Sequence, residues 1–270
     1  MRLIWWARFS TNFILWGNDT VRERLKNGIL ALSGIALLVL VWAAAFLLVG
    51  NELLAPSPLQ SARAFFALFA DAGFYRALLA TLLRTVIAFA GSAVLAAIFA
   101  VGAYLFPAFE RFFSGIVAVL RSLPTMAVLL MLLVWTTGDV SAVAVGFLGL
   151  FPMLYTAFAS ALLGVDGKLK EVCKVYRVGV KEQIKCLYLP HVLPRVVKEG
   201  GAGLSFGWKL TVSAEILAST FQSVGGMMQE AKFTYEYPTL FALTAVVCLL
   251  GVLVEWGANA LARHAERRLS

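Results

Sequence analysis

The sequence predicts an all-α polytopic membrane protein with six transmembrane helices. Of its 270 residues, 61% are hydrophobic and only 14% are charged, which leaves too few charges to cover the surface of a soluble protein. The mean hydropathy is +0.85, and several apolar runs reach the roughly 20 residues that cross a bilayer. A soluble helical core would need polar faces at a period near 3.6 residues, and these runs lack them.

The apolar runs place six spans along the chain, at residues 28–50, 77–105, 112–137, 140–163, 199–221 and 238–262. The first run is too long for the hydrophobic region of a signal peptide, so we expect an uncleaved span. Residues 1–27 before it include Leu3 to Trp16, a stretch with three tryptophans and two phenylalanines. Such a segment suits an amphipathic helix at the cytoplasmic face of the membrane. Packing on the spans is an equal alternative.

The lysines and arginines predict that the N- and C-termini are both cytoplasmic. They gather in residues 1–27, in the loop 164–198 after the fourth span and in the tail 263–270, whereas the opposite loops hold few of them. The net charge of +8 therefore reports the topology of the chain in membrane lipid. Because the charge is not concentrated on one face, we expect no nucleic-acid partner.

The segment 54–73 between the first two spans carries the sequence Pro56-Ser57-Pro58. Prolines just before an apolar pattern are a helix start signal. The pattern that follows is too short and too polar to cross a bilayer. We therefore expect a helix that lies on the outer surface of the membrane.

Reactive motifs are missing from the sequence. Cys173 and Cys186 fall in the predicted cytosolic loop and Cys248 in the last span, so we expect no disulfide framework. The histidines, His191 and His264, are far apart in the sequence and predict no metal site. Neither a P-loop nor a catalytic set of side chains occurs. We expect no cofactor and no enzymatic activity, so ATP-driven work would need an ATPase on another polypeptide.

The segment 171–190, EVCKVYRVGVKEQIKCLYLP, is a basic and polar stretch between long apolar runs. Residues Gly167 to Val178 predict a short helix of about 18 Å, whose apolar stripe can enter a groove on a cytosolic partner. That stripe comprises Leu169, Val172, Cys173 and Tyr176. Pro190 and Pro194 predict a break before the fifth span. Physical reasoning alone also allows an ordinary solvated loop here.

This loop resembles the EAA loop of the binding-protein-dependent ABC importer permeases, whose pattern is Glu-Ala-Ala, three residues, Gly, nine residues, Ile, any residue, Leu-Pro. Glu171, Val172 and Cys173 stand for the first three residues, and Leu187, Leu189 and Pro190 stand for the end. Arg177 occupies the glycine position, and Gly179 follows two residues later. From about residue 54 to residue 262, the chain resembles the nitrate, sulfonate and taurine type of these permeases.

The resemblance implies a type I ABC importer permease fold over residues 28–262, with 164–198 as the loop that couples the spans to an ATPase. It also implies a homodimer, two ATP-binding subunits that hold Mg-ATP, and an extracytoplasmic solute-binding protein. A heterodimer with a related permease is an alternative. The residues expected to couple to the ATPase are Leu169, Glu171, Val172, Cys173, Tyr176, Arg177, Gly179, Leu189 and Pro190.

Four charges lie inside the apolar runs, where each is costly unless it faces protein or water. They are Arg84, Arg121, Lys209 and Glu215. Lys209 and Glu215 are about 120° apart around a helix, so we expect one to face a cavity and the other a neighbouring span. For Glu215 we weigh a role in the pathway against an ion pair with Arg84 or Arg121. For Arg84 we favour a structural role.

Two further patterns concern the third and fifth spans. Pro124 predicts a kink that frees backbone carbonyls, either along the pathway or as a simple packing kink. Gly200, Gly201 and Gly203 predict close packing with another span or a second copy. The predicted translocation pathway comprises Arg84, Arg121, Ser122, Pro124, Thr125, Ser205, Trp208, Lys209, Glu215 and Ser219.

The charges within the spans indicate the class of solute. Three cations against one acid predict a positive potential, which favours a small organic anion such as a sulfonate, or a nitrate-like ion. The alternative is a heteroaromatic vitamin precursor of the thiamine-pyrimidine or riboflavin-like kind, because Phe206, Trp208 and Phe221 could stack on a planar ring. An ion-coupled secondary transporter would usually contain an internal repeat, and none relates the first three spans to the last three.

Overall fold

The computed structural model describes residues 30, 33–34, 36–48, 50 and 56–269. These residues divide into two units, 1–61 and 62–270. In the described part of the first unit, an apolar helix covers Ala36–Leu48. The predicted segment 1–27 and much of the predicted span 28–50 lie outside the described residues.

Helix α2 (Pro58–Leu68) begins at the predicted Pro-Ser-Pro signal. The Ser57 N–H donates to Gln60 Oε1 and the Gln60 N–H donates to Ser57 Oγ, both at 3.1 Å. This reciprocal pair is a capping box. Pro58 occupies the first helical position, where a missing N–H is harmless. The 11-residue helix confirms the prediction of a short helix in this segment.

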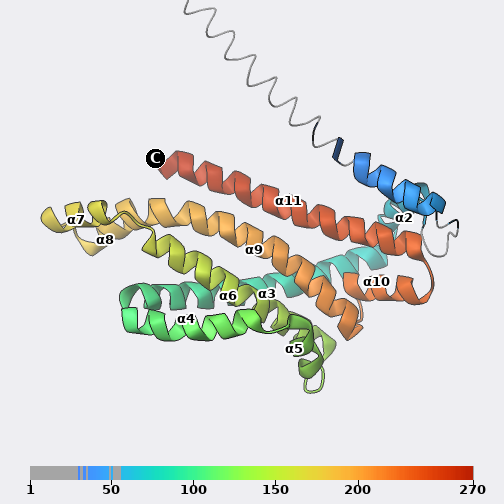
Figure 1. The fold of residues 1–270 in the computed structure, drawn as a ribbon, viewed down its shortest axis with the longest axis horizontal. Coiled ribbons are helices and arrows are strands. Elements are labelled where there is room, and N and C mark those ends of the chain that lie inside the picture. Colours follow the sequence, from blue (N-terminus) through green and yellow to red (C-terminus); the bar gives the residue numbers. More distant parts are fainter. Residues whose placement is uncertain (1–29, 31–32, 35, 49, 51–55, 270) are drawn as a thin grey trace, which may run out of the picture. The chain divides into compact units, whose positions relative to one another are not determined.

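The second unit consists of helices. They are α3 (Ala72–Leu105), α4 (Pro107–Ser122), α5 (Thr125–Leu132), α6 (Gly138–Leu163), α7 (Gly167–Val175), α8 (Val180–Gln183), the π-helix η1 (Ile184–Tyr188), α9 (Leu189–Ala218), α10 (Val224–Phe233) and α11 (Tyr237–Leu269). Helices α3, α6, α9 and α11 run side by side, with α7 and α8 at one end of the bundle and α10 at the other (Figure 1).

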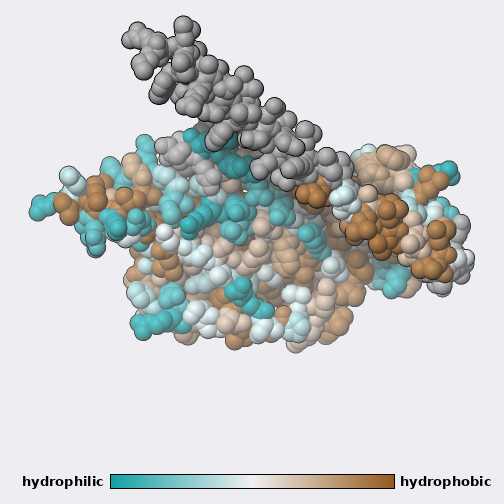
Figure 2. All heavy atoms as spheres, turned by 45° about the horizontal axis from the view of Figure 1, so that its top comes forward, coloured by the Kyte–Doolittle hydropathy of each residue, from teal (hydrophilic) through white to brown (hydrophobic). Residues whose placement is uncertain are grey.

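Among the described helices, α3, α6 and α11 are long and apolar enough to cross a membrane, and the bent pair α4 and α5 makes a fourth span if it is counted as one. Helix α9 has 30 residues, a sufficient length, but glycines, hydroxyl groups and charges make it less apolar. In Figure 2, hydrophobic atoms cover much of the visible surface, and hydrophilic atoms gather toward the end that carries α7.

Two of the predicted spans differ from the structure. The third, 112–137, is not one continuous helix, because α4 and α5 meet at an angle of 83° around Pro124. The predicted kink is confirmed. The fifth span, placed at 199–221, begins at Leu189, so the predicted break at Pro190 and Pro194 is wrong. The Leu189 N–H donates to the Ile184 carbonyl in a π-turn, which shifts the backbone register just before the first proline.

Small residues let the long helices approach closely. A Cβ added at Gly201 would collide with Ala258 of α11, and one at Gly203 would lie 3.0 Å from Leu154 of α6. Gly207 is similarly close to Leu150. The predicted glycine face is therefore a contact between spans of one chain. It fixes the orientation of α9 about its own axis, and so decides which of its residues are buried.

Candidate translocation and coupling sites

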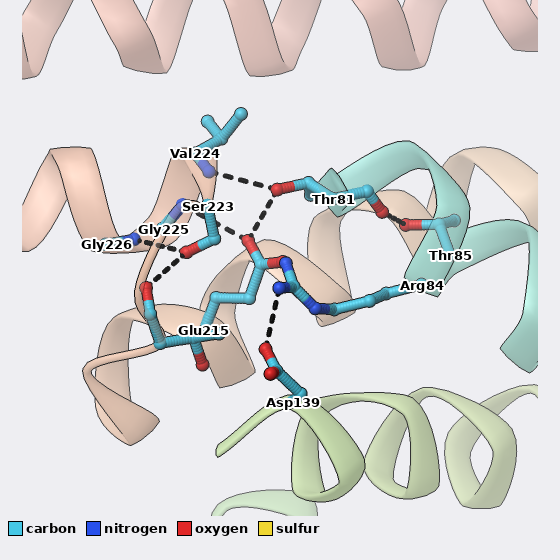
Figure 3. Close-up of polar contacts among 10 residues, drawn as sticks. Thr81, Arg84, Thr85, Asp139, Glu215, Ser223, Val224, Gly225 and Gly226 are labelled. Atoms are coloured by element: carbon cyan, nitrogen blue, oxygen red, sulfur yellow. Dashed lines mark hydrogen bonds and ion pairs between the residues drawn. The ribbon is translucent and has the colours of Figure 1, made fainter. Parts of the chain in front are cut away.

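The side chain of Glu215 is 0% exposed and lies where α3, α9 and α10 meet. Its Oε1 accepts a hydrogen bond from Arg84 Nη1 at 2.8 Å. Its Oε2 accepts from Thr81 Oγ1 at 2.9 Å and from the Gly225 N–H at 3.2 Å (Figure 3). Burying a carboxylate is costly unless it is paired and hydrogen-bonded. Here both oxygens have partners.

The N-terminus of α10 points its backbone donors at this carboxylate. Ser223 caps the helix, because its Oγ accepts from the Gly226 N–H at 2.8 Å. The Val224 N–H donates to Thr81 Oγ1 at 3.0 Å, so Thr81 links the helix end to the acid. A Cβ on Gly225 would collide with Glu215 Cβ. Glycine at this position allows the close approach, and the helix dipole then favours the negative charge.

Arg84 extends this network to a fourth helix, α6. Its Nη2 lies 2.6 Å from Asp139 Oδ1 in the first turn of α6 (Figure 3). The Arg84 side chain is 14% exposed and that of Asp139 is 61% exposed. Of the two ion pairs weighed from the sequence, the structure forms the one between Glu215 and Arg84. Sequence reasoning missed Asp139, although an acid in the first turn of a span opposite Arg84 is a usable signal.

Helix α9 carries two other predicted pathway residues on buried faces. Trp208 is 2% exposed, and its indole Nε1–H donates to the Val247 carbonyl of α11 at 3.0 Å. Ser205 is buried on the same side. Both side chains therefore face neighbouring helices of the same chain. Trp208 has no ring face open to a solute in this structure.

Lys209 lies on a different face of α9 and is exposed. Together with Arg195, Lys198 and Phe206, it marks a stripe that the neighbouring helices leave uncovered. A Cβ at Gly251 of α11 would lie 3.1 Å from Lys209 Cε, so the glycine leaves room for this side chain. We call the exposed residues Arg195, Lys198, Phe206, Lys209 and Leu217 the open stripe. Of these, the sequence analysis placed only Lys209 in the pathway.

The remaining predicted pathway residues lie near the bend of α4 and at the end of α9. Arg121, Ser122 and Pro124 are exposed around the bend, and Thr125 lines a small cavity between α5 and α6. Arg121 also lines a cleft of about 470 Å³ between α4, α6 and α9. Ser219 ends α9 with a φ of 49° and lines a cavity of about 530 Å³ beside α10.

The predicted coupling helix forms at α7. Asp166 caps it by accepting a hydrogen bond from the Lys168 N–H at 2.9 Å. The helix ends at Val175, so the prediction of a helix to Val178 is too long. The end is a Schellman turn, in which the Val178 N–H donates to the Cys173 carbonyl at 2.9 Å and the Arg177 N–H to the Lys174 carbonyl at 3.1 Å.

Arg177 adopts a φ of 49° at the position where the EAA pattern has glycine. This left-handed conformation is the one that glycine favours after a helix. The chain therefore forms a left-handed turn here with arginine in place of glycine. Gly179 then caps α8, and Leu189 and Pro190 begin α9.

One face of α7 is exposed and apolar. Leu169, Val172, Val175 and Tyr176 are all exposed, and Tyr176 is 77% exposed. The predicted stripe included Cys173, but its side chain is half-buried. Val175 takes its place, because the helix turns Cys173 toward the bundle. We call these four exposed residues the α7 face.

The opposite side of α7 is anchored to the end of α3. Lys170 Nζ lies 5.1 Å from the centre of the Tyr104 ring, a cation–π distance. The Tyr104 and Tyr188 hydroxyls form a hydrogen bond at 2.7 Å. That bond, more than burial, raises the pKa of Tyr188 above its ordinary value. A movement of α7 is thereby linked to α3.

Comparisons with known proteins agree with this architecture. The family described as binding-protein-dependent transport system inner membrane component matches residues 92–267. The taurine transport system permease protein of Escherichia coli (strain K12) is 24% identical over 84% of this chain and 85% of its own length. A permease of Bacillus subtilis (strain 168) named for aliphatic sulfonates transport is 29% identical over 59% of this chain and 56% of its own length.

Solved structures share the fold. The inward-facing methionine ABC transporter MetNI has a chain with a TM-score of 0.63 at 18% identity, covering 71% of this chain and 95% of that one. An amino acid ABC transporter crystallised with histidines gives 0.56 at 14% identity, covering 78% and 96%. The fold is that of type I ABC importer permeases. With the family match over more than half of its length, the chain belongs to the binding-protein-dependent inner membrane transport components, the membrane-spanning permease subunits of ABC importers.

Proposed function

We propose that this permease imports a small organic anion, such as a sulfonate, along the open stripe of α9. The observation that carries the proposal is how the intramembrane charges are divided. Glu215 is buried and paired with Arg84, whereas Lys209 and Arg121 are exposed. The acid and one cation neutralise each other inside the protein. The cations that remain would give the uncovered surface a positive potential.

A charged side chain in the middle of a span must face protein or water. Lys209 lies well inside α9, nine residues before its end at Ala218, on an uncovered face, so a lipid environment there would be costly. A second copy of the chain across this face would enclose a polar path. This argument supports a homodimer that works by alternating access.

The α7 face supports a contact between α7 and an ATPase on the cytoplasmic side of the membrane. Four exposed apolar residues on a basic helix are suited to a groove on a cytosolic ATPase. We infer that α7 lies on the cytoplasmic side and contacts one of two ATP-binding subunits, which hold and hydrolyse Mg-ATP. The α10 end would then face the solute-binding protein, and the chain termini would be cytoplasmic.

The names of two relatives support the solute class. One is named for taurine and the other for aliphatic sulfonates, and both names refer to compounds that carry a sulfonate group. The heteroaromatic alternative receives less support, because Trp208 is buried with its N–H bonded to Val247. Only Phe206 and Phe221 of the three aromatic residues are exposed.

The test is to reconstitute the permease with its ATPase and candidate solute-binding proteins in liposomes. The binding protein that stimulates ATP hydrolysis should retain a sulfonate or a similar organic anion. Lys209→Gln should slow uptake of that anion while ATPase assembly is unchanged, and Arg111→Gln, at an exposed charge on α4, serves as the control. A sugar or a polyamine as the retained ligand would refute the proposed solute class, and a planar heterocycle would select the alternative.

A further inference from the structure

We propose that the cleft between α4, α6 and α9 is an oxoanion-binding site at the inner end of the pathway. The cleft has a volume of about 470 Å³. Its polar lining comprises Arg121, Thr156, Ser160, Arg195, Lys198 and Glu199. These side chains come from three helices that are distant in sequence, so the fold brings them together. We call this cavity the cationic cleft.

Charge in the cationic cleft is unbalanced. It holds three cations and one acid, and neither of the ion pairs found among the side chains that the structure describes involves any of these four residues. Like charges gathered beside a low-dielectric protein interior repel one another. An anion bound among them would relieve that repulsion. Arg84 differs, because two carboxylates of its own chain already neutralise it.

The donors favour an oxoanion over a halide. A guanidinium group is planar and donates two parallel hydrogen bonds to a sulfonate, sulfate or phosphate group. Arg121 and Arg195 both line the cleft. The hydroxyls of Thr156 and Ser160 donate to the carbonyls of Pro152 and Ala157, at 2.7 and 2.9 Å. The two arginines and Lys198 are therefore the donors for the anion.

Arg195 places one end of the cleft near the α7 end of the bundle. A Cβ at Gly164, the residue that caps the end of α6, would lie 2.8 Å from Arg195 Nη1. Lys209 is 14 residues further along α9, about 21 Å at 1.5 Å per residue. The cationic cleft and Lys209 are therefore two separate positions on one face of α9. In the orientation proposed above, the cleft would hold the solute anion last, before its release to the cytoplasm.

The identity of the bound solute rests on the proposed function. The assignment of the cleft as an oxoanion-binding site does not depend on that identity. A phospholipid phosphate is also an oxoanion and could reach the same arginines. Arg121 stands in the last turn of α4, 14 residues from its start at Pro107, or about 21 Å along the helix. The start of α4 lies near α7, so Arg121 and its part of the cleft lie at the opposite end of this helix. We favour the solute anion for this reason.

The experiment uses the purified permease–ATPase complex in nanodiscs of zwitterionic phosphatidylcholine. Isothermal titration calorimetry with methanesulfonate and with inorganic sulfate should show saturable binding. Arg121→Gln and Arg195→Gln should each weaken that binding about tenfold or more, because each removes charge-assisted hydrogen bonds. Arg121→Lys and Arg195→Lys should weaken it less. Arg111→Gln, which removes an exposed charge elsewhere on α4, is the matched control and should bind normally.

Three results would overturn the site. One is the absence of saturable anion binding by the wild-type complex, and another is equal binding by the Arg121→Gln and Arg195→Gln variants. The third is displacement of sulfate when phosphatidylglycerol is added, together with Arg195-dependent retention of that lipid in native mass spectrometry, which would assign the cleft to lipid. The failures are distinguishable, since a neutral ligand on the binding protein would refute the proposed solute without changing sulfate binding by the cleft.

Discussion

At the scale of single residues, Arg177 gives a direct test of the turn after α7. Its φ of 49° is unfavourable for a residue with a Cβ, by roughly 1 kcal/mol. We expect Arg177→Gly to stabilise the protein by about 0.5–1 kcal/mol, and Arg177→Val to destabilise it. Melting temperatures of the purified protein in detergent would measure both changes. A lower melting temperature for Arg177→Gly would contradict the left-handed turn.

Glu215 and Arg84 form the second residue-scale test. Arg84→Gln leaves a fully buried carboxylate without its cation, which should destabilise the protein by about 3–5 kcal/mol. The double variant Arg84→Gln, Glu215→Gln should be less destabilised than the sum of the single changes. Asp139→Asn is the matched control, because its exposed side chain should cost only about 0.5 kcal/mol.

The measurement for this pair is a double-mutant cycle on thermal unfolding, supported by the yield of folded protein after solubilisation. Additive effects of the two substitutions would show that the pair does not couple. Additive effects would also count against the ion-pair role of Glu215. They would favour the alternative, a role for Glu215 in the translocation pathway.

Sequence reasoning located the intramembrane charges but could not orient them. Helical periodicity placed Lys209 and Glu215 on different faces, and the structure shows one exposed and one buried. The periodicity could not say which, because that depends on where α11 and α6 pack against α9. The same limit applies to Trp208. Its apolar ring and N–H donor suit either a solute or a neighbouring helix, so the sequence alone could not say which of the two it contacts.

At the scale of secondary structure elements, α7 is the part whose function is easiest to test. The α7 face presents Tyr176 with 77% of its surface exposed. If this face docks on the ATPase, Tyr176→Asp would bury an unpaired charge and weaken the association by about 3 kcal/mol or more. Membrane insertion should be unchanged. Tyr176→Phe keeps the apolar contact and should assemble normally.

A pull-down of the tagged ATPase from solubilised membranes gives the readout, with the amount of permease in the membrane fraction as the insertion control. Unchanged recovery of Tyr176→Asp would refute docking through this face. Loss of binding by Tyr176→Phe as well would point to the hydroxyl, and not to apolar contact, as the recognised group.

Proline effects on these elements were predictable only in part. Pro124 bends the chain as its missing N–H and ring would lead one to expect, although the angle of 83° depends on how α5 packs on α6. Pro190 and Pro194 do not interrupt α9, because the π-turn before them accommodates the first. A π-turn has no simple sequence signature, so this continuity could not be read from the sequence.

At the scale of the whole molecule, the hydrophobic composition and the spacing of the apolar runs were enough to predict a helical membrane protein. The pattern of residues 171–190 predicted the family to which the chain belongs. Helix α9 explains why hydropathy alone is insufficient for this fold. Its glycines pack against α6 and α11, and its charges serve an uncovered face and an internal ion pair. Of the long helices α3, α6, α9 and α11, it is therefore the one that is not apolar enough to be recognised as a span by hydropathy.

The open stripe leads to a prediction about assembly. Lys209, Arg195 and Lys198 are exposed along α9, and a single chain would have to present them to lipid or leave the path open on one side. Two copies facing each other would enclose the stripes in a shared polar path. Native mass spectrometry of the active transporter should therefore find two copies of this chain with two ATP-binding subunits. A single copy would refute the shared path, whereas one copy paired with a related permease would keep the path and change only the partner that completes it.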